Sequence, residues 1–229
     1  MKTIGLLGGM SWESTLGYYR AINEGIKNSL GGLHSAKIAM YSVDFEPIEQ
    51  LQHVGDWEKT AKILSEAAKS IEAAGADFLL ICTNTMHKVA PDIEAAIQIP
   101  LLHIADATAE VLVNLGIKSV GLLGTAFTME QEFYKGRLAN NYGLRVLIPN
   151  EEDREIVHKA IYKELCLGKS EPESKVEFLR IIDTLAAQGA EAAILGCTEI
   201  GMLVNQADTS VKLLDTTAIH AKKAVEYAT

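Results

Sequence analysis

The sequence has few cysteines, and they do not form a pairing pattern. Cys82, Cys166 and Cys197 are odd in number and belong to no CxxC motif, so neither a disulfide framework nor a zinc motif is indicated. Any chemistry that they carry is therefore that of single thiols, which persist in a reducing compartment.

The sequence also lacks an excess of positive charge and a long apolar run. It has 21 Lys and Arg against 30 Asp and Glu, a formal net charge of −9, and an acidic surface repels phosphate backbones. No run approaches the roughly 18 apolar residues of a membrane helix. Residues 1–13, MKTIGLLGGMSWE, are broken by glycines and show no cleavage pattern, which favours a first strand and turn over a signal peptide. We therefore expect a cytoplasmic protein with no nucleic-acid or membrane partner.

What is present is an alternation of short apolar runs with longer amphipathic stretches. The 229 residues, 48% of them hydrophobic, suit one large domain or two small ones at roughly 100–200 residues each. Ser174, with Glu177 three residues on, predicts a capping-box start for a helix over 174–187. The alternation predicts an α/β fold with parallel sheets covered on both faces. The expected strands are residues 2–9, 36–43, 77–83, 119–125, 144–149, 191–197 and 211–216.

Internal repetition is the most informative pattern. Residues 4–8 (IGLLG) recur as 120–124 (VGLLG), residues 75–83 match 189–197, and residues 101–102 recur as 213–214, with offsets of 116, 114 and 112. Unless generic apolar strands match by chance, the chain has two related halves. We expect residues 1–103 with 215–229 to form the first half and 104–214 the second. A pseudo-two-fold axis would relate them, with a cleft between them at the carboxyl ends of the strands.

The second repeat aligns Thr83 with Cys197. Under two-fold symmetry, the hydroxyl and the thiol would lie on opposite sides of a bound ligand. This arrangement suits a reaction that removes a proton from one face of a carbon and delivers one to the other, of which racemisation is the simplest. Cys82 precedes Thr83, so on a strand its side chain would point to the opposite face, into the core.

The segments GLLGGMSWEST, CTNTMH and GCTEI resemble the motifs of the aspartate/glutamate racemases that work without pyridoxal phosphate (PLP). The resemblance covers nearly the whole chain. It implies a small acidic amino acid as substrate, two cysteines as acid and base, no cofactor, no metal, and a homodimer. The first cysteine of the family is replaced here by Thr83. A thiolate with a lowered pKa is a competent base, whereas a neutral hydroxyl is a poor one, so we expect the L-substrate to be favoured.

Without a pyridoxal ring, the enzyme must stabilise an enolate-like carboxylate with fixed donors. The backbone N–H groups of Asn84, Thr85, Thr198 and Glu199 suit this task if they lie at the starts of helices. Glu199 could also orient a proton or bind the substrate ammonium. The alternative for Glu199 is a carboxylate stabilised by the helix dipole.

The resemblance implies three further substrate contacts. Met10 lies in the glycine turn, where the alternative is a turn with no ligand. Gln52 would bind the distal carboxylate, and as a neutral anchor it would accept both aspartate and glutamate; otherwise it is an exposed residue on a helix surface. Lys163 would lie near the substrate carboxylate, or else on a solvated helix face.

Other residues have plainer interpretations. Cys166 is expected on an amphipathic helix, with its side chain in the protein core. His87, His103 and His220 have no metal-ligand spacing, and His87 is either a hydrogen-bonding group of the cleft or a structural histidine.

Two other functions stay open. One is a related cysteine-dependent isomerase or decarboxylase acting on a small dicarboxylate, similar to maleate isomerase, in which Cys197 is the nucleophile. The other is a non-catalytic binder of amino acids, which gives no reason for the GCTE motif.

Overall fold

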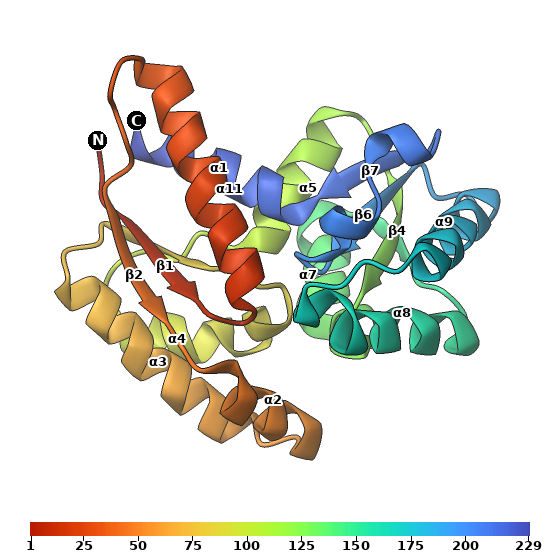
Figure 1. Cartoon of the computed structure of the whole chain (residues 1–229), viewed down its shortest axis with the longest axis horizontal. Coiled ribbons are helices and arrows are strands. Elements are labelled where there is room, and N and C mark those ends of the chain that lie inside the picture. Colours follow the sequence, from red (N-terminus) through yellow and green to blue (C-terminus); the bar gives the residue numbers. More distant parts are fainter. The chain divides into compact units, whose positions relative to one another are not determined.

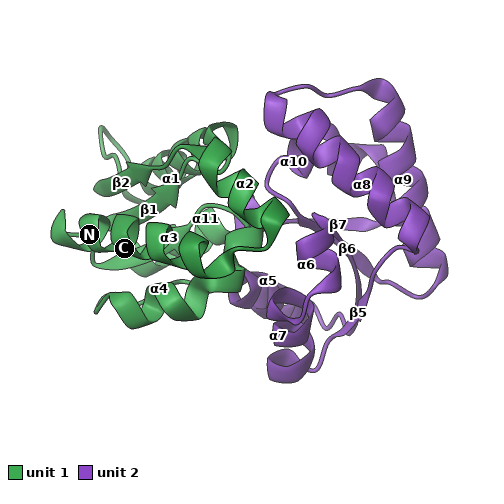
Figure 2. Ribbon diagram, turned by 90° about the horizontal axis from the view of Figure 1, so that it is seen from below, with its two compact units in different colours: residues 1–104, 220–229 green, residues 105–219 purple.

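The computed structural model describes residues 1–229, which form two compact units. Unit 1 consists of Met1–Ile104 and His220–Thr229, and unit 2 of Ala105–Ile219 (Figure 2). The contacts thus place residues 215–219 in unit 2, whereas the sequence assigned them to the first half. One reason is that the Thr216 hydroxyl donates a hydrogen bond to the Leu195 carbonyl of unit 2 at 2.8 Å.

Unit 1 contains a three-stranded parallel sheet in the order β2-β1-β3. Its strands are β1 (Ile4–Gly8), β2 (Ile38–Ser42) and β3 (Phe78–Ile81). Figure 1 shows β1 and β2 side by side. The helices are α1 (Trp12–Leu30), α2 (Phe45–Val54), α3 (Trp57–Ala73), α4 (Ala90–Ala96), the 3-10 helix η1 (Thr85–Val89) and most of α11 (Thr216–Ala228).

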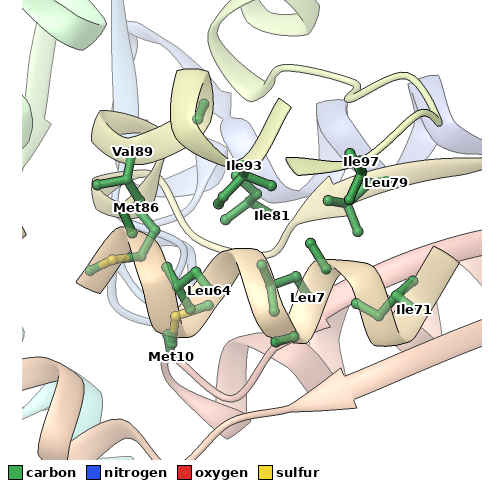
Figure 3. Packing of buried hydrophobic residues seen from close by; sticks show 14 of the residues in the cluster. Leu7, Met10, Leu64, Ile71, Leu79, Ile81, Met86, Val89, Ile93 and Ile97 are labelled. Carbon is green, nitrogen blue, oxygen red and sulfur yellow. The ribbon is translucent and has the colours of Figure 1, made fainter. Parts of the chain in front are cut away.

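Both faces of this sheet are covered, which explains the nearly continuous apolar strands. On one face, Leu7, Leu79 and Ile81 pack with side chains of α3 and α4, such as Leu64 and Ile93 (Figure 3). The opposite face carries the alternate strand residues against α1 and α11; its largest members are Ile4, Leu6, Tyr18, Ile22, Phe78 and Leu80.

Unit 2 contains a four-stranded parallel sheet in the order β5-β4-β6-β7. Its strands are β4 (Ser119–Gly124), β5 (Arg145–Leu147), β6 (Ala192–Gly196) and β7 (Lys212–Asp215). The helices are α5 (Ile104–Asn114), whose first residue belongs to unit 1, α6 (Ala126–Glu130), α7 (Glu132–Tyr142), α8 (Glu151–Lys163), α9 (Pro172–Ala187) and α10 (Ile200–Leu203), with the 3-10 helices η2 (Leu165–Leu167) and η3 (Gln206–Asp208). None of the helices in either unit combines the length and apolarity that crossing a membrane requires.

The internal repeat extends to the pairing register of the strands. Ile4 pairs with Phe78 in unit 1, and the repeat-related Val120 pairs with Ala192 in unit 2. The third repeat follows the same rule: a bridge joins Leu79 to Leu101, and Ala193 pairs with Leu213. The predicted α/β fold with parallel sheets is therefore confirmed, and all seven expected strands are present.

Candidate functional site

The turn after β1 has a backbone that only glycine accommodates easily. Gly9 has φ of +94°, and a Cβ atom there would run into the backbone of Val43. Thr15 fixes the turn, because its hydroxyl accepts from the Gly9 N–H at 2.8 Å and donates to the Ser11 carbonyl at 2.9 Å. The end of β1 is thus bound to the start of α1.

Met10 lies within this turn, but its side chain is buried at 3% exposure in an apolar cluster. Figure 3 shows it beside Leu64, in the same cluster as Met86. The side chain is therefore a core residue of unit 1. A contact between Met10 and substrate stays a prediction.

Thr83, Asn84 and Thr85 follow β3, and all three are buried. The Ser14 hydroxyl of α1 donates to the Cys82 carbonyl at 3.2 Å, which joins this segment to the helix that follows the glycine turn. Unit 1 therefore brings the ends of β1 and β3 together, as parallel strands require.

Cys82 directly follows β3, and its side chain lies in the core as expected. It is fully buried among Phe78, Leu80 and Tyr18, and burial raises the pKa of its thiol. It is therefore a core residue of unit 1.

Gln52 is the residue of α2 that the sequence singled out. It is 2% exposed, so the alternative of an exposed surface glutamine is wrong. A buried amide requires hydrogen-bonding partners. Gln52 is therefore a buried polar residue of unit 1, and its contact with substrate stays a prediction.

In unit 2, the segment after β6 places a thiol against a carboxylate. Cys197, Thr198 and Glu199 are all buried, with Glu199 only 2% exposed. The Cys197 thiol donates to Glu199 Oε2 at 2.9 Å, and the Thr198 hydroxyl donates to the same oxygen at 2.7 Å. Glu199 therefore accepts two hydrogen bonds from the two residues before it. These bonds hold its carboxyl group in addition to any stabilisation by a helix dipole.

This environment changes the expected ionisation of Cys197. Burial raises the pKa of its thiol well above the ordinary value of 9.0, and the neighbouring Glu199 carboxylate and Cys166 raise it further. The expectation of a lowered pKa is therefore wrong for the protein without substrate. In this arrangement the Cys197 thiol is a hydrogen-bond donor, and Glu199 Oε2 is the acceptor directly beside it.

The predicted position of Cys166, in the core on an amphipathic helix, is wrong. Cys166 lies on η2, is only partly buried, and is close enough to Cys197 to affect its pKa. The preceding helix, α8, ends at Lys163, before Cys166 is reached. Lys163 is exposed in the last turn of α8, as the solvated-face alternative expected, and its contact with substrate stays a prediction.

Thr83 and Cys197 both carry side-chain groups that can donate or accept a proton. Thr83 and Cys197 each lie two residues beyond a matched pair, since Ile81 pairs with Leu7 and Leu195 pairs with Leu123. The two units thus present a hydroxyl and a thiol at equivalent places. His, Cys, Asp and Glu side chains form no group of three or more that could hold a metal ion.

Known proteins are similar to this chain in sequence and in fold. Residues 7–224 match the family model described as Asp/Glu/hydantoin racemase. A candidate Asp/Glu racemase from Yersinia pestis is 58% identical, with a TM-score of 0.92 over 100% of this chain and 99% of that one. An aspartate racemase homologue from Pyrococcus horikoshii OT3 is 37% identical, with a TM-score of 0.85 over the same shares of the two chains. The broad specificity amino-acid racemase RacX of Bacillus subtilis (strain 168) is 24% identical over 177 residues, 74% of this chain and 73% of that protein. The chain therefore belongs to the Asp/Glu/hydantoin racemase family.

Proposed function

We propose that this protein racemises an acidic amino acid, aspartate or glutamate or both, by proton transfer at Cα without a cofactor. The observation that carries the proposal is the Cys197 thiol held by the Glu199 carboxylate, at the position where the other unit has Thr83. Family membership and the names of the relatives support an amino-acid racemase.

The proposed reaction starts with Glu199 taking the thiol proton of Cys197. The thiolate then removes the α-proton of the L-substrate, and the electron pair of the C–H bond moves into the carboxylate as an enolate. The Thr83 hydroxyl delivers a proton to the opposite face of Cα and regains one from water. Glu199 finally releases its proton to water, and the α-proton stays on Cys197, so the protein returns to its starting state.

Substrate binding follows from the same proposal. The backbone N–H groups of Asn84, Thr85, Thr198 and Glu199 would stabilise the enolate-like carboxylate. A fully buried amide such as Gln52 would bind the distal carboxylate without a charge requirement.

Met10 and Lys163 would complete the substrate contacts. The expected homodimer is a separate prediction, which sedimentation of the purified protein tests. The expected cytoplasmic location is a further prediction, which cell fractionation tests.

The direction of turnover follows from the difference between the two groups. A neutral hydroxyl donates a proton more readily than it accepts one, so kcat from the L-form should exceed kcat from the D-form. Because the equilibrium constant of a racemisation is one, kcat/KM must be equal in the two directions, and KM for the L-form must be higher in proportion. Initial rates and KM values from both enantiomers, followed by circular dichroism, test this expectation.

The function itself is tested by incubation with L-aspartate or L-glutamate in D2O, with NMR for deuterium at Cα and chiral chromatography for the D-form. Exchange with inversion supports racemisation, and it should persist after dialysis against a chelator. A new product would instead support the cysteine-dependent isomerase or decarboxylase. Binding without exchange would support a non-catalytic protein.

A further inference from the structure

We infer that His87 is a positioning residue that fixes the peptide between Thr83 and Asn84. Its effect on turnover rests on the proposed function, but the hydrogen bonds that carry the inference lie within unit 1. His87 is in η1, four residues after Thr83, and only 1% of it is exposed.

Both ring nitrogens of His87 have defined partners. Nδ1 lies 2.8 Å from the Thr83 carbonyl oxygen, and Nε2 lies 3.3 Å from the backbone nitrogen of Ile104, the first residue of α5. The Ile104 N–H is a donor, so Nε2 must be the unprotonated acceptor. The proton is therefore on Nδ1, which donates to the Thr83 carbonyl. The ring is a neutral link between the segment after β3 and the start of α5.

Neighbouring rings hold His87 in place. The His103 ring centroid is 4.4 Å away and that of His220 is 6.1 Å away. His220 is itself fixed, because Tyr18 donates to its Nδ1 at 2.9 Å and its Nε2 donates to the Leu102 carbonyl at 2.7 Å. A ring packed in this way cannot swing away without disturbing several buried contacts.

The link determines where the next amide points. In a trans peptide, the carbonyl and the following N–H lie in one plane and point in opposite directions. Because the Thr83 carbonyl points toward His87, the Asn84 N–H points away from it. His87 thus orients one of the proposed carboxylate donors, along with the backbone of Thr83 itself.

Two substitutions separate the ends of this link. His87→Asn places an amide N–H near the position of Nδ1, so it can still donate to Thr83 but cannot reach Ile104. His87→Gln places an amide oxygen near the position of Nε2, so it can accept from Ile104 but gives Thr83 no donor. The exposed His34 provides a control, His34→Gln.

The readout is the fate of the L-substrate in D2O. Once the proton that Cys197 has captured exchanges with D2O, Cys197 can return deuterium to the same face, which gives labelled L-form. Inversion, in contrast, needs correctly placed groups on the Thr83 side. His87→Gln should lower the ratio of inversion to retention by about ten- to a hundredfold, the effect of a small misplacement. His87→Asn should restore most of the ratio, and His34→Gln should leave it unchanged. A role in stability alone would lower both products together, and that result, or an Asn variant no better than Gln, would overturn the inference.

A second measurement keeps this inference separate from the proposed function. Nitrogen-15 NMR of the wild-type imidazoles should show His87 protonated at Nδ1 and bare at Nε2 near neutral pH. The opposite tautomer would overturn the inference even in an active racemase. If the wild type neither exchanges nor inverts aspartate or glutamate, the proposed function fails. In that case the tautomer, with faster hydrogen exchange of the Ile104 amide in His87→Asn than in His87→Gln, still decides the link.

Discussion

At the scale of single residues, Cys197 is the group with the strongest chemical consequence. Replacing its sulfur by oxygen in Cys197→Ser leaves a far weaker acid and base, and turnover should fall by roughly 10²–10⁴-fold. Cys82→Ser is the matched control, because this thiol is also fully buried but belongs to the apolar core of unit 1. It should keep most of its kcat and lose some stability. Equal losses of kcat in the two variants would contradict the assignment.

Glu199 should control the ionisation of the same thiol. Burial and the Glu199 carboxylate raise the pKa of Cys197, so removal of this charge in Glu199→Gln should lower that pKa toward its ordinary value. The thiolate fraction at pH 8 rises accordingly, and alkylation of Cys197 by iodoacetamide should be about three- to tenfold faster. Peptide mapping separates Cys197 from the other two thiols. Slower alkylation in Glu199→Gln would contradict this electrostatic effect on the pKa. Turnover should nevertheless fall in the same variant, because glutamine cannot take the thiol proton that starts the proposed reaction.

Sequence patterns predict single residues well where backbone periodicity decides the outcome. Cys82 could be assigned to the core because side chains alternate along a strand. The hydrogen bond from Cys197 to Glu199 could not be predicted, since it depends on side-chain rotamers. Cys166 was misplaced because the end of α8 at Lys163 has no proline or glycine to mark it in the sequence.

At the scale of the elements, the turn after β1 depends on Gly9. Gly9→Ala would force a Cβ atom into the Val43 backbone at positive φ, and the free energy of unfolding should fall by about 1–3 kcal/mol. Gly17→Ala is the control, since Gly17 lies on the exposed face of α1 with open space around it. This substitution should raise stability by about 0.5–1 kcal/mol. Urea unfolding measures both, and similar values for the two would show that the turn tolerates a side chain.

The elements also show where local signals are overridden by tertiary contacts. The seven apolar runs were recognisable because both faces of each sheet are covered. The capping box at Ser174 was a wrong prediction: α9 begins at Pro172, whose fixed φ suits the first turn of a helix. Ser174 instead donates to the Glu164 carboxylate at 2.6 Å, a partner ten residues away that no local pattern reveals.

At the scale of the whole molecule, the internal repeats of the sequence predict which residues of the two units are equivalent. Offsets of 116, 114 and 112 between repeats differ because the connecting loops differ in length. The strand pairings absorb these differences, so that Ile4 with Phe78 and Val120 with Ala192 hold the same register. The equivalence of Thr83 and Cys197 could therefore be predicted from the repeats. The histidine network could not, because it joins residues as far apart in the chain as Tyr18 and His220.

His220 connects that network to the stability of the whole molecule. It follows the second crossing of the chain between the units and is fully buried. Burial lowers its pKa from 6.5 to about 4, which the hydrogen bond to Leu102 opposes only in part. The folded protein therefore holds His220 neutral, whereas the unfolded chain binds a proton below about pH 6.5. The stability that this provides is complete above pH 6.5 and is lost as the pH falls toward 4.

This difference predicts the acid sensitivity of the wild type. From pH 7.5 to pH 5, proton binding by the unfolded chain at this one histidine should lower the free energy of unfolding by about 2 kcal/mol. His220→Gln keeps a donor for the Leu102 carbonyl but has no titrating group, so it should start less stable at pH 7.5 and lose about 2 kcal/mol less on acidification. Urea titrations of both proteins at the two pH values give the difference directly, because all other titrating groups are shared. If the two proteins lose the same stability, His220 is not the buried neutral group that its contacts indicate.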